Sequence, residues 1–276
     1  MLINANSFHD LQKILQHPFP NIGIRINTEV AAGVEARYDV STRRSKFGVP
    51  LSQKEAILQA YADHPRLNAL HFHIGSGMTS IAPFQEAFQG IKSLLDDIHR
   101  KREEMGIQER IVLLDIGGGL KAEPEADQFH LVRALGQLVK EQFSYENAPR
   151  IITEFGQYVH THHAFLLTEI SDILQHDARQ ATMILSAGAN LFLRQAYTDT
   201  PPPFKYELLE HPVSKEKLNY DLAGPLCFSG DYIARSITLP EAAAGQHLII
   251  DRIGANTFSL YSDHCSLPFP KVVYIQ

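Results

Sequence analysis

The stretch Ala69–Gly77, which reads ALHFHIGSG, joins a short apolar run to a polar, glycine-framed end. The run has the length of a strand, and its continuous apolar character is typical of a strand buried on both faces of a parallel sheet. Alternation along the strand puts His71 and His73 on the same face. Gly75 and Ser76 then begin a tight turn. The stretch therefore predicts a buried strand with polar groups at its end, although a buried histidine with a satisfied hydrogen bond explains the pattern as well.

The same pattern recurs through the first part of the chain. Strand-like runs bounded by Gly, Pro or Asn occur at Ile22–Asn27, Ala69–Ile74, Ile111–Ile116 and Ile151–Glu154. Apolar residues with a helical period lie between them, at Ser7–Leu15, Ser52–Ala62, Pro83–Arg102 and His130–Glu141. Alternating strands and helices predict an α/β fold. Because only four or five units are present, we expect a partial (β/α)8 barrel of the TIM type rather than a complete one.

The pattern changes after Tyr158, where strand-like runs dominate. They are His163–Ile170, Ala181–Leu185, Gln246–Asp251 and Val272–Ile275. A proline-rich loop (Pro201–Pro203) and the polar stretch Ser214–Asn219 are expected to interrupt them. The sequence thus predicts two domains, a partial barrel over residues 1–160 and an all-β domain over residues 161–276.

Composition excludes several classes of protein. The 276 residues include 31 acidic and 25 basic side chains, for a formal net charge of −6, which gives no electrostatic footprint for nucleic acid. No apolar run approaches the length of a membrane span, and the N-terminus lacks the pattern of a signal peptide. The 2 cysteines, Cys227 and Cys265, cannot build a disulfide scaffold. We therefore expect a cytoplasmic globular protein that binds neither membranes nor nucleic acid.

Three strand ends or loops carry candidate functional residues. Gly117–Gly119 follow a buried strand and remove every Cβ where a phosphate or a neighbouring backbone could approach, without forming a dinucleotide or Walker motif. Glu154 ends another buried strand, and a carboxylate there requires a cationic or donor partner in the protein or a ligand. Cys227, in GPLCFSGD, lies in a loop that favours exposure, although a buried structural thiol is the common alternative.

Histidines cluster near the predicted domain boundary, at His160, His162 and His163. Their spacing matches no common zinc motif, so we expect no metal site. A hydrolase that uses these histidines is therefore the least favoured function.

Taken together and in order, the motifs resemble those of the alanine-racemase-fold (type III) pyridoxal-phosphate-dependent decarboxylases, the diaminopimelate and ornithine decarboxylase family. The matching segments are SKFG (Ser45–Gly48), HFHIGSG (His71–Gly77), LDIGGGL (Leu114–Leu120), TEFGQY (Thr153–Tyr158), GPLCFSGD (Gly224–Asp231) and GANTFSL (Gly254–Leu260). The C-terminal stretch SLYSDHCSLPFPKV is similar to the siderophore-pathway branch. The resemblance implies α-decarboxylation of an amino acid, either a siderophore precursor or a basic amino acid, with pyridoxal 5'-phosphate as cofactor.

The resemblance also implies a role for each matched residue. His73 would stack on the pyridine ring, and Glu154 would pair with its protonated nitrogen. Ser76 and Gly117–Gly119 would hold the phosphate. Cys227 would reach across a homodimer interface, complete the partner's site and return a proton to the substrate as a general acid. Substrate contacts would come from three further residues, Arg194, Tyr197 and Asp231.

Several positions depart from the family pattern. The lysine that binds the cofactor covalently would precede SKFG, and neither Lys13 nor Lys46 matches its position. Gln157 and Asn256 replace an arginine and a tyrosine of the family, and Phe228 replaces an acidic residue that diaminopimelate decarboxylases use on their substrate. The chain is therefore expected to be an N-terminally truncated decarboxylase or a non-catalytic pseudoenzyme or partner subunit. A small cofactor-binding protein with the same barrel is a further alternative, which the β domain and the Cys227 loop disfavour.

Overall fold

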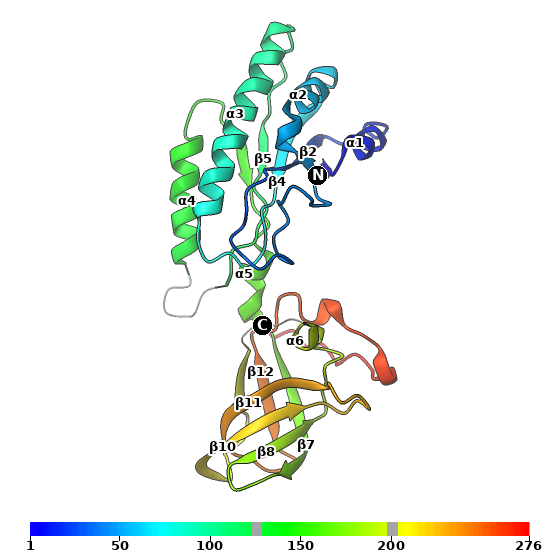
Figure 1. Cartoon of the computed structure of the whole chain (residues 1–276), viewed down its shortest axis with the longest axis vertical. Helices are drawn as coiled ribbons and strands as arrows, with labels where there is room; N and C mark the ends of the chain where they lie inside the picture. The colour runs from blue at the N-terminus through cyan, green and yellow to red at the C-terminus, as the bar shows by residue number, and fades with distance from the viewer. Residues whose placement is uncertain (123–128, 198–203, 276) are drawn as a thin grey trace. The chain divides into compact units, whose positions relative to one another are not determined.

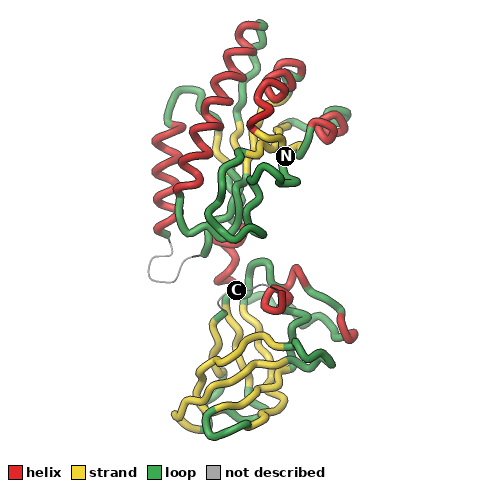
Figure 2. The backbone as a smooth tube through the Cα atoms, viewed as in Figure 1, coloured by secondary structure: helices red, strands yellow, loops and turns green. Residues whose placement is uncertain are grey.

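The computed structural model describes residues 1–122, 129–197 and 204–275. The chain forms two compact units, Met1–Tyr158 and Val159–Gln276 (Figure 1). Helices lie beside the strands of the first unit, whereas strands dominate the second (Figure 2). Each unit has its own apolar core, so each is described by itself.

The first unit is built on a parallel sheet with the strand order β1-β2-β4-β5-β6, and the short β3 pairs with β2. The strands are β1 (Leu2–Ala5), β2 (Asn21–Asn27), β3 (Val49–Pro50), β4 (Leu67–Phe72), β5 (Leu113–Asp115) and β6 (Arg150–Ile152). A single sequential order of parallel strands joined by helices is the arrangement of a barrel segment. The sequence predicted four of these strands and missed two, β1 and the two-residue β3.

Helices join the strands, and local sequence explains where they begin. They are α1 (Phe8–Ile14), α2 (Lys54–Asp63), α3 (Ala82–Glu104), α4 (His130–Phe143) and α5 (Gly156–His160). The Ser7 hydroxyl accepts a hydrogen bond of 3.1 Å from the amide of Asp10 and caps α1. Pro83 occupies the first turn of α3, where its missing N–H costs nothing. Short 3-10 helices lie at Leu51–Gln53, Thr161–His163, Phe258–Leu260 and His264–Ser266.

An aromatic cluster joins the sheet of the first unit to its longest helix. Phe72 of β4 packs edge-on against Phe84 and Phe88 of α3, with ring centres 6.5 and 5.8 Å apart. Phe143, at the end of α4, reaches Phe88 at 5.3 Å. These rings are nearly inaccessible to solvent, so they fix both helices against the strand that carries the histidines.

The second unit is a six-stranded mixed sheet with the order β11-β10-β8-β7-β12-β9. Its elements are β7 (Phe165–Gln175), β8 (Gln180–Leu185), α6 (Leu193–Tyr197), β9 (Lys205–Leu208), β10 (Ser214–Ala223), β11 (Tyr232–Glu241) and β12 (His247–Asp251). All its neighbouring strands are antiparallel except β8 and β10.

Two expectations for the second unit are wrong. The polar stretch Ser214–Asn219 is the first half of β10, which alternates polar residues with apolar ones that reach the core. In contrast, Val272–Ile275 has no strand partner and is exposed to solvent by 57 to 90%. An apolar, β-branched run thus forms a strand only where a neighbouring strand is available to pair with it.

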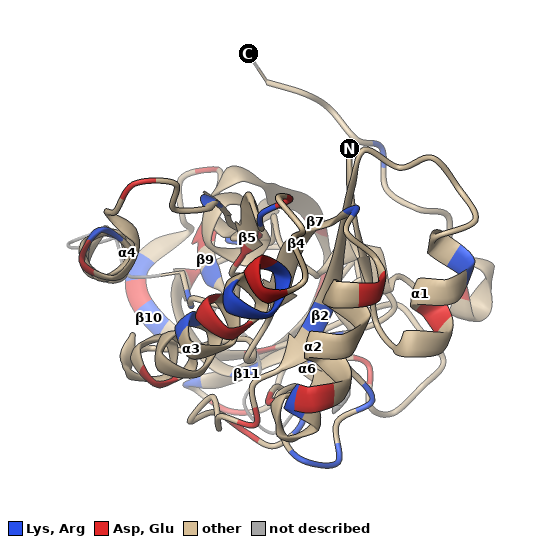
Figure 3. Cartoon of the chain, turned by 90° about the horizontal axis from the view of Figure 1, so that it is seen from above, with Lys and Arg blue, Asp and Glu red and all other residues tan. Residues whose placement is uncertain are grey.

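Charges of both signs alternate over the helices of the first unit, as Figure 3 shows for α3. Across the described ranges, no helix combines the length and apolar character that a membrane span requires.

Arg102, near the end of α3, is almost fully buried and acts as a clamp for backbone carbonyls. Its guanidinium donates to the carbonyl oxygens of Tyr61 (2.9 and 3.0 Å), Leu67 (2.9 Å) and Glu109 (2.9 Å). These carbonyls belong to the end of α2, the start of β4 and the loop before β5. One side chain therefore ties three segments of the first unit together.

We predict that Arg102→Met destabilises the first unit by about 3 kcal/mol, because buried carbonyls lose charged donors. The measurement is urea unfolding followed by circular dichroism at 222 nm, which reports mainly on this helix-containing unit. Arg100→Met is the matched control: Arg100 lies on the same helix, is largely exposed and pairs with Asp97, so its loss should cost under about 1 kcal/mol. If both variants lost the same free energy of unfolding, Arg102 would not hold the three segments together as proposed.

Candidate functional site

Ionisable side chains from neighbouring strands of the first unit lie in one row across the sheet. The strand register pairs Arg25 of β2 with His71 of β4, and His71 with Asp115 of β5. Residues paired across adjacent strands face the same side of a sheet. Beyond β6, the Glu154 carboxylate lies 3.8 Å from the His71 ring and within 4.8 Å of the Asp115 carboxylate. The parallel register thus gathers four charged or titratable groups.

The two carboxyl groups of this row have different surroundings. Asp115 is only 4% exposed, whereas the Glu154 side chain is 50% exposed. The pKa of Asp115 is raised to about 6, by burial first and also by Glu154. Hydrogen bonds from the Gly117 amide (3.0 Å) and the Asn4 side chain (3.4 Å) oppose it. The pair therefore accommodates a second negative charge poorly and favours a positively charged group beside it.

His71 of the row and the nearby His73 both have lowered pKa values, which favour neutral rings near pH 7. The pKa of His71 is lowered to about 3, by burial first and then by Arg25 and His73. Burial and Arg25 also lower the pKa of His73. Both ring nitrogens of His71 are buried without a hydrogen-bond partner among the described residues. His73 is partly satisfied, since its Nδ1 accepts a hydrogen bond of 3.0 Å from the Gly118 amide.

The glycine triplet after β5 is packed against neighbouring strand ends. A Cβ on Gly117 would meet the His73 ring at 2.6 Å, and one on Gly118 would collide with the Glu154 carbonyl. A Cβ on Gly119, whose φ is +101°, would collide with the Gly75 carbonyl. The amides of Gly117 and Gly118 already donate to the side chains of Asp115 and His73. Close backbone packing thus explains the triplet, and these two amides are engaged within the protein.

Other predicted residues have simple positions. Ser76 is half-buried, and its amide donates to the Tyr38 carbonyl at 2.9 Å. Lys13 and Lys46 are exposed. The Lys46 Nζ lies 5.0 Å from the centre of the Phe47 ring, which Arg25 also contacts at 4.5 Å. The charged groups that shift the pKa values of the row include no lysine.

The remaining predicted residues belong to the second unit. Cys227 is exposed in the loop between β10 and β11. Arg194 is half-buried in α6, and the side chain of Tyr197 lies outside the described part of the structure. Asp231 is only 3% exposed, and its carboxylate accepts backbone hydrogen bonds from Ala189 (2.6 Å) and Leu226 (2.7 Å). These bonds hold the Cys227 loop and engage the carboxylate within the protein, whereas the sequence predicted that Asp231 contacts the substrate.

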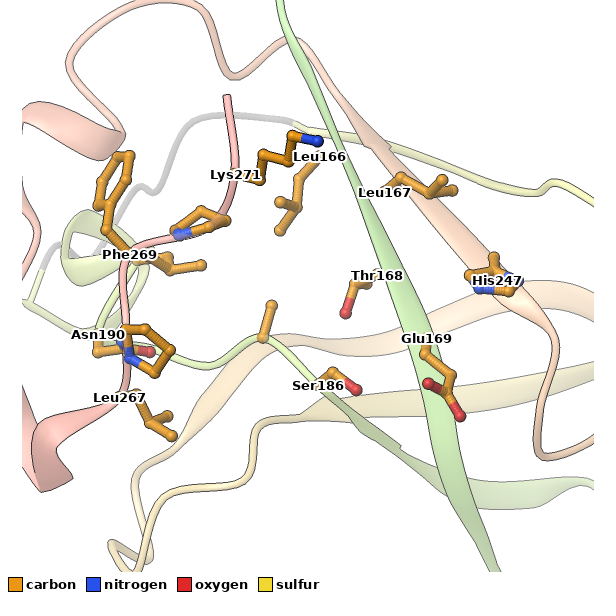
Figure 4. Close-up of a pocket in the computed structure, with 14 residues that line it drawn as sticks. Leu166, Leu167, Thr168, Glu169, Ser186, Asn190, His247, Leu267, Phe269 and Lys271 are labelled. Atoms are coloured by element: carbon orange, nitrogen blue, oxygen red, sulfur yellow. The ribbon is translucent and has the colours of Figure 1, made fainter. Parts of the chain in front are cut away.

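A cavity of about 550 Å³ lies in the second unit, between β7 and the C-terminal segment. Figure 4 shows Thr168 of β7 on one side, with Phe269 and Lys271 of the C-terminal segment on the other. The Thr168 hydroxyl and the Asn190 side-chain oxygen are buried there without a hydrogen-bond partner among the described residues. The cavity is lined by none of the predicted site residues.

Metal-ligating atoms converge at one place in the described ranges. Those of His71, Asp115 and Glu154 lie within 4.8 Å of one another. Arg25 acts electrostatically on both of these carboxylates, and its positive charge opposes a metal ion. His160, His162 and His163 form no such group within the described residues. The hydrolase alternative therefore has no geometric support there.

Sequence reasoning identified Glu154 and His73 but missed Arg25, Asn4 and Asp115 as members of the site. Arg25 interrupts an otherwise apolar strand, IGIRIN, and Asp115 ends another. A charged residue inside a buried strand is a signal that requires a partner. The partner itself becomes identifiable only from the strand register.

Residues 1–161 match the family model "Pyridoxal-dependent decarboxylase, pyridoxal binding domain". Diaminopimelate decarboxylase of Aquifex aeolicus is 28% identical over 264 residues, which cover 92% of this chain and 59% of that protein. The enzyme of the same name from Methanothermobacter thermautotrophicus is 30% identical over 268 residues, with the same two coverages. The chain thus spans about three fifths of the length of these curated relatives.

A solved structure shows that the fold is shared across both units. The crystal structure of diaminopimelate decarboxylase from Helicobacter pylori complexed with L-lysine matches with a TM-score of 0.76 and 24% identity. The match covers 95% of this chain and 65% of that one. The predicted fold class, a partial barrel followed by a β domain, is thereby confirmed.

We predict that Asp115→Asn makes the first unit more stable relative to the wild type as pH rises. The folded-state pKa of about 6 lies above the ordinary value of 3.8. The bound proton therefore stabilises the wild type below about pH 4, and this contribution is lost as pH rises through 6. Between pH 4.5 and 8, the unfolding free energy of the variant should gain about 1–2 kcal/mol over that of the wild type. Urea unfolding at the two pH values measures it.

Asp97→Asn is the control for this prediction, in the same unit and without a pH effect in this range. A hydrogen bond from Lys54 lowers the pKa of Asp97 below its ordinary value of 3.8. Asp97 is therefore ionised in both the folded and the unfolded state above pH 4.5, so its replacement should cost nearly the same stability at pH 4.5 and at pH 8. A pH-independent difference between wild type and Asp115→Asn would refute the buried-carboxyl interpretation.

Proposed function

Because the chain belongs to the family of pyridoxal-dependent decarboxylases, we propose that it serves the α-decarboxylation of an amino acid with pyridoxal phosphate as cofactor. The observation that carries this proposal is the row of Arg25, His71, Asp115 and Glu154 at the strand ends of the matched unit. The family depends on this cofactor, and the resemblance derived from the motifs is confirmed.

The charges of the row suit the protonated ring nitrogen of the cofactor. The Asp115 and Glu154 carboxylates lie within 4.8 Å of each other, and the raised pKa of Asp115 reflects burial first and Glu154 second. Arg25 offsets part of the negative charge. A further cation beside Glu154, which remains half exposed, relieves the remaining repulsion. We therefore assign Glu154 to the ring nitrogen, as the motif suggested.

Two neutral imidazole rings lie near the Glu154 carboxylate. His73, whose pKa burial lowers, offers a flat uncharged ring on which an aromatic cofactor can stack. The orphaned nitrogens of His71 supply further hydrogen-bonding capacity beside Glu154. For the phosphate, Ser76 and Gly119 remain the candidates, because the amides of Gly117 and Gly118 are engaged. When bound, the cofactor supplies an electron sink for the electron pair left by the loss of CO₂.

Cys227 is the proposed proton donor. Its thiol is exposed on the loop that Asp231 holds, as a group that returns a proton to the substrate must be. We further propose that the enzyme is a homodimer in which this loop of one subunit completes the site of the other. Arg194 and Tyr197 are proposed to contact the substrate, and Asp231 to position the loop.

Phe228 bears on the choice of substrate. It stands where diaminopimelate decarboxylases of the family carry an acidic residue, and it is 51% exposed. An exposed apolar ring offers no charge to a second amino-acid centre. We therefore propose a basic amino acid or a siderophore precursor as substrate. The two exposed thiols of the chain, Cys227 and Cys265, also agree with a reducing compartment, the cytoplasm.

The non-catalytic alternative rests on Lys13 and Lys46, neither of which matches the position of the family's cofactor lysine, and on the replacements at Gln157 and Asn256. The relatives and the solved structure reported above are decarboxylases, which favours an enzyme. The test is direct: the purified chain is mixed with pyridoxal phosphate and candidate amino acids, and CO₂ release is followed. Borohydride reduction and mass mapping then locate any lysine adduct. One stoichiometric adduct with CO₂ release supports the enzyme, whereas background labelling without turnover supports the alternative.

We predict that Glu154→Gln weakens binding of pyridoxal phosphate about ten-fold, because a charge-assisted hydrogen bond becomes a neutral one. Equilibrium dialysis of the cofactor measures this without requiring turnover. Glu146→Gln, in an exposed turn of the same unit, controls for the change of net charge and should bind as the wild type does. Equal affinities for all three proteins would remove Glu154 from the site.

A further inference from the structure

The chain's 2 cysteines lie side by side although 38 positions separate them. The Sγ atoms of Cys227 and Cys265 are 3.5 Å apart, and both residues are exposed. The family motif that contains Cys227 says nothing of Cys265, which belongs to the C-terminal stretch. Two exposed thiols within contact distance constitute a dithiol site, so what holds them there decides whether the contact is built into the fold.

Consecutive residues of the second unit anchor the two thiol-bearing segments. The Ala189 amide donates to the Asp231 carboxylate, which also accepts from Leu226, next to Cys227. The carbonyl of the next residue, Asn190, accepts from the Ser262 amide at 3.0 Å, three residues before Cys265. The loop after β10 and the C-terminal segment are thus fastened to the same turn after β8.

The C-terminal segment is also held in an unfavourable backbone conformation. Cys265 and Ser266 have φ values of +58° and +56°, in the left-handed region that favours glycine. Around them, the Tyr261 hydroxyl donates to the Leu267 carbonyl at 2.6 Å, and the Tyr261 and Phe269 rings pack 5.2 Å apart. Such strain persists only where surrounding contacts impose it, and here it directs Cys265 toward Cys227.

We propose that Cys227 and Cys265 form a reversible intramolecular disulfide when a peroxide oxidises the pair. A disulfide requires its sulfurs at about 2.05 Å, so the thiols must approach by about 1.5 Å, which rotation about χ1 in two exposed loops can supply. The Cys227–Cys265 contact raises the pKa of Cys227, so oxidation through its thiolate should accelerate with rising pH.

The chemistry balances with hydrogen peroxide as the oxidant. One thiolate attacks the peroxide, the O–O bond breaks, and a sulfenic acid forms while one oxygen leaves as water after protonation. The second thiol then attacks that sulfur, the S–O bond breaks, and a second water leaves. The two sulfurs together lose two electrons and two protons, and the peroxide is reduced to water. A small dithiol reverses the change by exchange.

The consequence for activity rests on the proposed function of Cys227 as proton donor. A disulfide sulfur carries no proton, so the oxidised protein cannot return one to the substrate from this residue. The dithiol would then be a switch that stops decarboxylation under oxidising conditions. Cys265 takes no part in the proposed catalysis, and its replacement should leave the basal rate unchanged while abolishing the switch.

The first experiment tests the cross-link alone and needs no cofactor. The reduced full chain is treated with hydrogen peroxide at low protein concentration, and free thiols, intact mass and proteolytic peptides are measured. We expect both thiols to disappear, with loss of two hydrogens and a peptide pair that joins Cys227 to Cys265. Dithiothreitol should restore both thiols. Cys265→Ser should instead gain oxygen at Cys227. Independent oxygen addition at both residues of the wild type, or only links between chains, would overturn the proposal.

The second experiment separates the switch from the proposed function. With pyridoxal phosphate and substrate, the rate of CO₂ release from the wild type should fall about a hundred-fold on oxidation, as loss of a general acid predicts, and recover with dithiothreitol. Cys265→Ser should keep its rate under the cross-linking treatment. A cross-link with an unchanged rate would refute the regulatory role. Absence of turnover in every sample would refute the proposed function and leave the first experiment's result intact.

Discussion

The close approach of the Asp115 and Glu154 carboxyl groups is the constraint on which the other charged and polar groups of the site depend. Two carboxyl groups at the ends of adjacent parallel strands repel each other when both are ionised, and Asp115 is almost inaccessible to water. The surrounding groups reduce this cost. Arg25 supplies positive charge, Asn4 and the Gly117 amide donate hydrogen bonds, and His71 stays neutral. Four strands, β1, β2, β4 and β5, and the segment that follows β6 thus contribute to one electrostatic arrangement.

The glycine triplet illustrates how sequence patterns hold more than one meaning. Three glycines after a buried strand predict that something approaches the backbone closely, and that much is correct. What approaches is the end of each neighbouring strand: the His73 ring and the carbonyls of Glu154 and Gly75. The glycines therefore let the carboxylates and imidazoles converge, which is a requirement of the site even where their own amides do not face a ligand.

Local patterns predicted the units of the barrel but could not give the row of charges. Apolar runs and helical periodicity locate most strands and helices of the first unit, since those elements depend on their own residues. Arg25 and His71 become neighbours only through the register of β2 and β4, a pairing between segments more than forty positions apart. The same limit explains Val272–Ile275, whose composition favours a strand, whereas a strand also requires a partner edge. The same limit explains β10, because the polar first half of this strand pairs with β11.

The groups of the proposed chemistry belong to two units with separate cores: the carboxylates to the first and the thiols to the second. The carboxylate row depends on strands β1 to β6 alone, while the thiol pair depends on the turn at Ala189 and Asn190. In the second unit, Gly188 and Gly224 leave room for the Asp231 carboxylate, since a Cβ at either position would crowd it. That carboxylate holds the Cys227 loop against the turn that also anchors the segment carrying Cys265. The buried carboxylate that fixes the proposed proton donor thus also fixes the geometry by which the donor can be oxidised, so the position of Cys227 and its sensitivity to peroxide have one structural origin.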